Sequence, residues 1–125
     1  MMALAVGTDI VEIQRVAKVL SRQGDLFVRR ILCEAEQAEY QRLNQSAAFL
    51  AKRFAAKEAV AKALGTGIGH GVSFQDIQVV NNEKGAPGVE LHGGAAEVLK
   101  SMGGSRVLIS LADEQQYAVA YVILV

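Results

Sequence analysis

The sequence predicts an α+β domain in which helices from the N-terminal half pack on an antiparallel sheet. Apolar residues recur at helical spacing from residue 12 to residue 64, whereas after Gly71 they form short runs separated by turn residues, as in β-hairpins. The chain has 125 residues, of which 51% are hydrophobic and 21% are charged. This length and apolar content suit one hydrophobic core, so residues 1–125 are expected to form a single domain.

The first elements are expected to be a strand and three helices. Residues 3–8 form a short apolar run, which predicts a buried strand with Asp9 at its exit. From residue 12 to residue 22 the apolar positions follow the spacing of an amphipathic helix. Two shorter helices are expected at 26–32 and 34–43, the second with acidic residues in its first turn, where they complement the helix dipole.

Residues 47–64 give the strongest helix prediction, because they are rich in Ala, Lys and Leu and contain no Gly or Pro. Gly65 is placed to end this helix, and glycine then recurs at alternate positions as far as Gly71. That spacing excludes a regular element and permits close backbone approach to a ligand. The last strand is apolar on both faces, which suits a central strand or one sealed by a neighbouring subunit. The elements expected here are a hairpin at 74–80 and 89–92, a helix at 94–102, and a hairpin at 106–111 and 117–125.

The charges sum to zero, with 13 Lys and Arg residues against 13 Asp and Glu residues. This balance excludes the uniformly basic field of a non-specific nucleic-acid binder. Residues 1–65 hold ten of the basic residues but only seven of the acidic ones, so the N-terminal half could recruit phosphate groups or an acidic protein. An apolar chain without net charge is also expected to self-assemble, so that copies of itself cover its apolar surface.

The cysteine content and the N-terminus indicate the compartment. The single Cys33 cannot form an internal disulfide, and no Cys and His residues lie at zinc-ligand spacing, which favours a reducing environment. No segment is long enough to span a membrane, and residues 1–6 lack the basic residues of a signal peptide. We therefore expect a cytoplasmic protein.

The helix at 47–64 carries charges on its apolar side. At about 100° per residue, Arg53 and Lys57 fall within the arc of large apolar residues. A charge directed into an apolar interface needs a partner, which can be another side chain, a metal or an anionic ligand. The opposite side is mostly alanine, so it is expected to let another helix approach closely.

Glu58 and Lys62 lie at the edge of that arc, one turn apart. They can form an ordinary i, i+4 ion pair, and Asp9 can cap the helix that begins near residue 12. Alternatively, Asp9, Glu58 and Lys62 come together beside the glycine-rich segment. Two carboxylates, an ammonium group and a nearby glycine segment suit a hard divalent cation with phosphate groups. The segment is not a Walker loop, because it follows its helix and lacks the terminal GK[ST].

Two stretches resemble the signatures of the 4′-phosphopantetheinyl transferases. Residues 7–15 (GTDIVEIQR) resemble the first signature, and residues 53–67 (RFAAKEAVAKALGTG) resemble the second, with the expected separation. The resemblance extends over 72–77 and from residue 110 to Tyr121, so it covers nearly the whole chain. The length matches the short, single-domain group of this family, the holo-[acyl-carrier-protein] synthases of fatty-acid synthesis, rather than the longer two-repeat group.

The resemblance implies a magnesium-dependent enzyme. It would transfer the 4′-phosphopantetheine arm of coenzyme A to a serine of apo acyl carrier protein and release adenosine 3′,5′-bisphosphate. Asp9 and Glu58 are then the metal ligands, for Mg²⁺ or Mn²⁺. Glu58, directly or through a metal-bound water, takes the proton of the serine, and Lys62 neutralises charge on the pyrophosphate as its bond breaks. The implied catalytic residues are therefore Asp9, Glu58 and Lys62.

The resemblance also implies residues that bind the coenzyme. Lys62 contacts the pyrophosphate, and Arg53 is the candidate for the 3′-phosphate. Gly65, Thr66 and Gly67 are expected to offer backbone donors to phosphate.

The implied partners are an acidic acyl carrier protein and two further copies of the chain, since similar short synthases are homotrimers with sites at subunit interfaces. Arg15, Lys18 and Arg22 lie at i, i+3 and i+7 on one side of the helix at 12–22 and are the implied docking residues. A solvated helix face is the alternative for Lys18 and Arg22. Neither nucleic acid nor a membrane is expected as a partner.

Two other functions remain open at this point. The first is a non-catalytic trimeric module that binds carrier protein or nucleotide. The second is a Mg²⁺-dependent phosphohydrolase, although no residue is distinctly placed to activate a water nucleophile.

Overall fold

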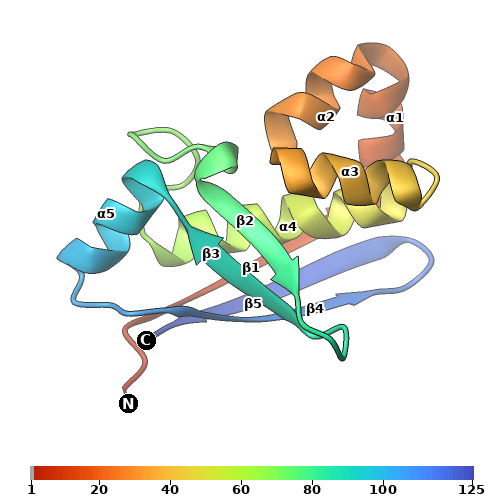
Figure 1. Ribbon diagram of the computed structural model, residues 1–125. Helices are drawn as coiled ribbons and strands as arrows, with labels where there is room; N and C mark the ends of the chain where they lie inside the picture. Colours follow the sequence, from red (N-terminus) through yellow and green to blue (C-terminus); the bar gives the residue numbers. More distant parts are fainter. Residues whose placement is uncertain (1) are drawn as a thin grey trace.

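The fold is organised around one long helix, α4, which packs on a three-stranded sheet (Figure 1). The computed structural model describes residues 2–125. Figure 1 shows α1, α2 and α3 grouped at one end of α4, and α5 near the other end. These elements form the α+β architecture that the sequence predicts. In chain order they are β1 (Ala5–Glu12), α1 (Ile13–Gln23), α2 (Asp25–Ile31), α3 (Glu34–Arg42), α4 (Ala47–Ala63), the 3-10 turn η1 (Phe74–Asp76), β2 (Ile77–Asn81), β3 (Pro87–Leu91), α5 (Gly93–Ser101), β4 (Val107–Asp113) and β5 (Tyr117–Leu124).

The strands form two antiparallel sheets. The larger has the order β1-β5-β4, and the smaller is the hairpin of β2 and β3. β5 is the central strand, as its apolar residues on both faces predict, and its inner residues Ala118, Ala120 and Val122 are fully buried. Pairing of β1 with β5 places Thr8 opposite Tyr121, which joins the two ends of the chain. No local pattern indicated this pairing, because strand partners far apart in sequence are chosen by packing.

The first strand differs from its prediction. β1 continues through Asp9 to Glu12, so Asp9 lies within the strand and not at its exit. The strand is also not fully buried, since Val6 and Ile10 on its outer face are exposed. The N-cap residue of α1 is Glu12, so the prediction that Asp9 caps this helix is wrong.

The strand expected at 74–80 also begins later. Residues 74–76 form the 3-10 turn η1, in which the Ser73 N–H donates to Asp76 Oδ2 at 3.2 Å. An acidic side chain that accepts a bond from a backbone N–H three residues earlier stabilises a turn over an extended strand. β2 therefore starts only at Ile77.

β1 packs closely on α4 because Gly7 has no side chain. A Cβ atom on Gly7 would overlap the carbonyl oxygen of Ala59 and lie 2.8 Å from the backbone nitrogen of Ala63. Both Ala59 and Ala63 are buried, so this side of α4 is covered. The prediction that the alanine side of α4 admits another helix is therefore wrong, because its close neighbour is a strand.

The charges on the apolar side of α4 are buried and partnered by other side chains. The Lys57 side chain is fully buried, and its Nζ lies 2.6 Å from Glu36 Oε1. Arg53 is 6% exposed; its Nη2 donates to Asn81 Oδ1 at 2.9 Å, and its Cζ lies 4.6 Å from the centre of the Phe49 ring. Arg53 and Lys57 could have been partnered by another side chain, a metal or an anionic ligand. Both residues have side-chain partners from the same chain.

The face of the larger sheet turned away from α4 is apolar and exposed. We call it the outer sheet face and define it by Val6, Ile10, Leu108, Tyr117 and Tyr121, which alternate along β1, β4 and β5 with the buried residues. Val6 is 58% exposed, Ile10 64% and Tyr121 51%. Thr8 and Ser110, which pair with Tyr121 from the two neighbouring strands, add exposed polar groups to this face. A face with several large exposed apolar side chains is typical of a protein interface.

Candidate active site

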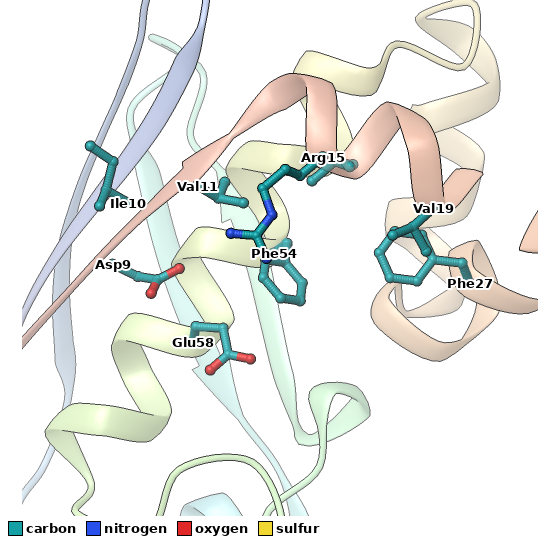
Figure 2. Close-up of a pocket in the computed structure, with 9 residues that line it drawn as sticks. Asp9, Ile10, Val11, Arg15, Val19, Phe27, Phe54 and Glu58 are labelled. Carbon is teal, nitrogen blue, oxygen red and sulfur yellow. The ribbon is translucent and has the colours of Figure 1, made fainter. Parts of the chain in front are cut away.

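Asp9 and Glu58 line one pocket of about 290 Å³ at the edge of the larger sheet (Figure 2). Asp9 comes from β1 and Glu58 from α4, and α1 and α2 supply the opposite wall. Figure 2 shows the two carboxylates at one end of the pocket and Val19 and Phe27 at the other. The pocket is thus acidic at one end and apolar at the other. Its lining residues are Asp9, Ile10, Val11, Arg15, Val16, Val19, Phe27, Phe54 and Glu58.

The packing of β1 on α4 brings the two carboxylates together. Alternate residues of a strand face the same side, so Asp9 faces α4 as Gly7 does. Gly7 contacts α4 at Ala59, which is the residue after Glu58. The close approach at Gly7 therefore sets the separation of Asp9 from Glu58.

Lys62 is bonded to Asp9. Its Nζ lies 2.8 Å from Asp9 Oδ1 and 3.1 Å from the carbonyl oxygen of Thr8. The Asp9 side chain is 15% exposed and that of Lys62 is 52% exposed, so the ammonium group is accessible from solvent. Within residues 2–125 Lys62 forms an ion pair with Asp9 and none with Glu58, so the prediction of an i, i+4 pair along α4 is wrong.

The pKa of Glu58 is raised above its usual range. Burial is the main cause, because it disfavours the charged carboxylate. The negative charge of Asp9 raises the pKa further, whereas the positive charge of Lys62 lowers it. Glu58 therefore holds a proton more readily than an exposed glutamate, as suits a group that accepts a proton or binds a cation.

The donor atoms fit a hard divalent cation that is held jointly with a substrate. Asp9 and Glu58 provide carboxylate oxygens, which Mg²⁺ prefers. In the described part of the chain, no group of three or more His, Cys, Asp or Glu side chains is arranged to hold a metal ion. Mg²⁺ is commonly bound by one or two carboxylates together with substrate phosphates and water. The pair of carboxylates suits that mode of binding.

The glycine-rich segment after α4 closes the helix end. The N–H of Gly65 donates to the Lys62 carbonyl at 3.0 Å, and those of Thr66 and Gly67 donate to the Ala61 carbonyl at 3.2 and 3.0 Å. Gly65 has a φ of 82°, which the turn requires. In this conformation all three N–H groups donate to carbonyls of α4, so their predicted binding of phosphate stays a prediction.

Arg53 does not line the pocket of Asp9 and Glu58. It lies along a separate hollow that also contains Glu36 and Asn81. Its Nε atom is buried and has no hydrogen-bond partner within residues 2–125. Because this atom is buried, an acceptor from outside the chain does not reach it in this conformation.

The three basic residues of α1 have different positions. Arg15 lines the pocket, and Figure 2 shows its side chain directed toward the end that holds Asp9 and Glu58. Lys18 and Arg22 are exposed further along α1, beside a shallow hollow. The structure therefore brings Arg15 into the site and leaves the other two on the adjacent surface.

The aromatic part of the pocket was not predicted from the sequence. The rings of Phe27 and Phe54 lie 6.5 Å apart, and those of Phe54 and Phe74 lie 5.7 Å apart. Phe54 precedes Glu58 by four residues on α4, so helical spacing could have placed it beside that carboxylate. No sequence pattern indicated Phe27, because its position depends on how α2 folds back toward α4.

Comparison with known proteins agrees with this geometry. A family model described as the 4′-phosphopantetheinyl transferase superfamily matches residues 5–122. The chain belongs to this superfamily. Both signature stretches lie within the match, and residues of both line the one pocket.

Members of the superfamily resemble this chain over its whole length. The holo-[acyl-carrier-protein] synthases of Shewanella amazonensis and Photobacterium profundum are 56% and 55% identical to it; each alignment covers 99% of this chain, and 99% and 98% of the relative. The crystal structure of the Neisseria meningitidis synthase superposes with a TM-score of 0.92 at 38% identity and covers 98% of both chains. The Helicobacter pylori synthase, solved in complex with coenzyme A, has a TM-score of 0.85 at 31% identity and covers 96% of this chain and 99% of its own.

This superfamily member has no helix within residues 2–125 that is long and apolar enough to cross a membrane.

Proposed function

We propose that this transferase moves the 4′-phosphopantetheine arm of coenzyme A to a serine of apo acyl carrier protein, giving holo acyl carrier protein and adenosine 3′,5′-bisphosphate. The observation that carries the proposal is that Asp9 and Glu58, one from each signature stretch, line one pocket while Lys62 is bonded to Asp9. The names of the relatives and the coenzyme A in the H. pylori structure support the same reaction. The reaction would serve fatty-acid biosynthesis in the cytoplasm.

Glu58 is the proposed base. Its carboxylate accepts the proton of the serine hydroxyl, and the serine oxygen attacks the β-phosphorus of coenzyme A. The bond from that phosphorus to the bridging oxygen breaks, and the electron pair leaves on adenosine 3′,5′-bisphosphate. The raised pKa of Glu58 makes it a better proton acceptor than an exposed glutamate.

Asp9 and Glu58 are also the proposed ligands of Mg²⁺ or Mn²⁺. When bound, the cation supplies positive charge to the pyrophosphate oxygens. Lys62 is positioned beside Asp9 to donate to the same oxygens.

Arg53 is the proposed ligand of the 3′-phosphate of coenzyme A, because the resemblance implies this role and Arg53 lines a hollow. Because Arg53 and Glu58 line different hollows of one chain, we place the coenzyme between two copies. The outer sheet face supports self-association, because a large apolar surface is unfavourable in water. The assembly we propose is a homotrimer, as the resemblance to the short synthases implies.

The outer sheet face provides a test of assembly. We expect Tyr121→Glu to convert the oligomer to monomers, because it places a charge in the middle of an apolar interface. Size-exclusion chromatography with light scattering measures the mass. Leu26→Glu is the control, since Leu26 is 69% exposed on α2, outside this face, and should leave the mass unchanged. A Tyr121→Glu protein with the mass of the wild type would contradict the assembly proposed here.

Arg15 provides a test of carrier-protein binding. We propose that Arg15, Lys18 and Arg22 contact the acidic carrier protein, with Arg15 nearest the reacting serine. Arg15→Glu is expected to raise the KM for carrier protein about tenfold, because it puts a like charge against an acidic partner. Lys84→Glu, in the exposed turn between β2 and β3, is the matched charge reversal and should leave KM unchanged. Equal effects of the two substitutions would show that only net charge matters.

The reaction itself is tested by mass spectrometry. Apo acyl carrier protein is incubated with this protein, coenzyme A and Mg²⁺, with an EDTA sample as control. The expected result is a mass gain of one phosphopantetheine arm that is lost with EDTA. Saturable binding of coenzyme A and carrier protein without any mass gain would instead indicate a non-catalytic binding module.

A further inference from the structure

We propose that Lys57 and Gln75 are positioning residues for the acceptor substrate, because they fix helix α2, and with it the Phe27 wall of the pocket, relative to Glu58. This inference rests on the proposed function, in which the acceptor is an acidic carrier protein. Neither residue lines the pocket or has a part in the chemistry described above.

Lys57 connects α4 to the end of α2. Its buried Nζ donates to the Ile31 carbonyl at 2.7 Å, to Glu36 Oε1 at 2.6 Å and to the Phe74 carbonyl at 3.1 Å. Ile31 is the last residue of α2, and its carbonyl has no acceptor role within that helix. One side chain of α4 therefore holds α2, the first turn of α3 and η1 together.

Glu36 completes this connection. Its Oε1 also accepts from the Cys33 N–H at 2.7 Å, and its Oε2 accepts from the Val79 N–H at 2.8 Å. Both oxygens of the Glu36 carboxylate therefore accept hydrogen bonds from protein donors. The ammonium group of Lys57 has three oxygen partners. A fully bonded buried pair has a defined geometry, because each lost bond would leave a buried polar group unpaired.

Gln75 holds the same helix end from η1. Its Nε2 donates to the Arg29 carbonyl at 2.7 Å and to the Leu32 carbonyl at 2.8 Å. Gln75 is exposed, unlike Lys57. Gln37 of α3 also donates its Nε2 to the Leu32 carbonyl, at 2.9 Å. The terminal carbonyls of α2 are thus bonded by side chains from three other elements.

These bonds matter because α2 has few other features that define its position. The helix has seven residues and follows Gly24, whose backbone (φ 56°, ψ −131°) is accessible mainly to glycine. The buried residues Val28 and Ile31 attach α2 to the core, but apolar contacts are non-directional. Hydrogen bonds depend on distance and angle, so they define the rotation and register of the helix.

The position of α2 decides the shape of the apolar end of the pocket. α2 contributes Phe27, which lies against Phe54 and opposite the carboxylates in Figure 2. The acidic end is held separately by the contact of Gly7 with α4. A shift of α2 should therefore alter binding of the acceptor at the α1 and α2 side, and leave coenzyme and cation binding at Asp9 and Glu58 nearly intact.

The test compares Lys57→Met and Gln75→Ala with Gln45→Ala. Met retains the length of the Lys57 side chain without its donors. Gln45 is a matched control, because it is an exposed glutamine that lies beside Asp25 and Val28 of α2, but its Nε2 bonds only Gln41 Oε1 and no carbonyl of α2. Initial rates are measured with carrier protein varied at saturating coenzyme A, and then with coenzyme A varied. Hydrogen exchange of the α2 amides reports local opening of the helix independently of activity.

We expect the KM for carrier protein to rise about tenfold in Lys57→Met and about threefold in Gln75→Ala, with faster exchange of the α2 amides. In Gln75→Ala the kcat and the KM for coenzyme A should stay within about twofold of the wild type, and Gln45→Ala should match the wild type. In Lys57→Met the KM for coenzyme A should rise as well, because Glu36 loses its ion-pair partner and lines the same hollow as Arg53. If these residues had a purely structural role, the substitutions would lower the yield of folded protein. They would not raise the KM for carrier protein more than the KM for coenzyme A. If Lys57→Met does not fold, Gln75→Ala alone decides the question.

Two results would overturn the inference. In the first, exchange of α2 increases while the KM for carrier protein stays at the wild-type value. In the second, the KM values for carrier protein and coenzyme A rise together in Gln75→Ala, which would indicate general loosening of the site. Failure of the proposed function is distinguishable from both results, because the wild-type protein would then modify no carrier protein. In that case the role of Lys57 and Gln75 in acceptor binding would also be wrong.

Discussion

Glu58→Gln is expected to lower the rate of transfer about 10³-fold and, without divalent cation, to raise the melting temperature of the protein. Glutamine retains the shape of glutamate but can neither accept the serine proton nor provide an anionic ligand to a cation. Activity is measured as the rate at which apo acyl carrier protein gains mass. A variant with more than about a tenth of the wild-type rate would remove Glu58 from the role of base.

The change in stability follows from the pKa of Glu58. Burial and the charge of Asp9 raise the pKa of this carboxyl in the folded protein above the ordinary value of 4.5. The folded state therefore binds the proton more tightly than the unfolded state does. Stability is lost as the pH rises through the window between the two pKa values, and the ionised carboxylate remains unfavourable above it.

Glu58→Gln is therefore expected to melt at a higher temperature than the wild type at about pH 8. The difference should disappear at about pH 4, where the Glu58 carboxyl is largely protonated in both the folded and the unfolded state. Thermal unfolding in EDTA at the two pH values measures this difference. Glu97→Gln, on the exposed surface of α5, is the control for loss of one surface charge and should show no such pH-dependent gain. A lower melting temperature for Glu58→Gln at about pH 8 would contradict the origin assigned to the raised pKa.

Gly7→Ala is expected to reduce the free energy of unfolding by about 3 kcal/mol or more and to abolish most of the activity. The added methyl group would overlap the Ala59 carbonyl oxygen and lie 2.8 Å from the Ala63 nitrogen, and both are backbone atoms that no side-chain rotation can move. β1 must then shift from α4, which separates Asp9 from Glu58. Denaturant unfolding and the transfer assay measure the two effects.

Gly88→Ala is the matched control. Gly88 also lies in a strand, but a Cβ atom there would meet only Val80 Cγ2, at an ordinary contact distance of 3.6 Å. Its stability should change by less than about 1 kcal/mol. A Gly7→Ala protein as stable and active as Gly88→Ala would show that the close contact of β1 with α4 does not set the geometry of the site.

Local sequence patterns were sufficient for the helices. α4 was predicted from its composition and from Gly65, and the structure places its end where this glycine permits the turn. The burial of Arg53 and Lys57 also followed from helical spacing. These features depend on residues within one or two turns of each other, so periodicity is enough to predict them.

The partners of the site residues could not be predicted in this way. Lys62 is four residues from Glu58, yet its ion pair is with Asp9, which is 53 residues away in the chain. The free N–H groups expected at 65–67 are used by α4, and Phe27 enters the pocket from a helix that carried no such indication. Each of these contacts depends on how separate elements pack.

The sequence by itself therefore determined the elements, the buried charges of α4 and, through two signature stretches, the residues around which a site could form. Only the tertiary structure decided that β1 pairs with β5 and lies against α4 at Gly7. This packing also decides that the ammonium group of Lys62 pairs with the carboxylate of Asp9. The physical reason is that helical and strand periodicity act over a few residues, whereas the position of Asp9 beside Glu58 and Lys62 depends on packing between segments about fifty residues apart.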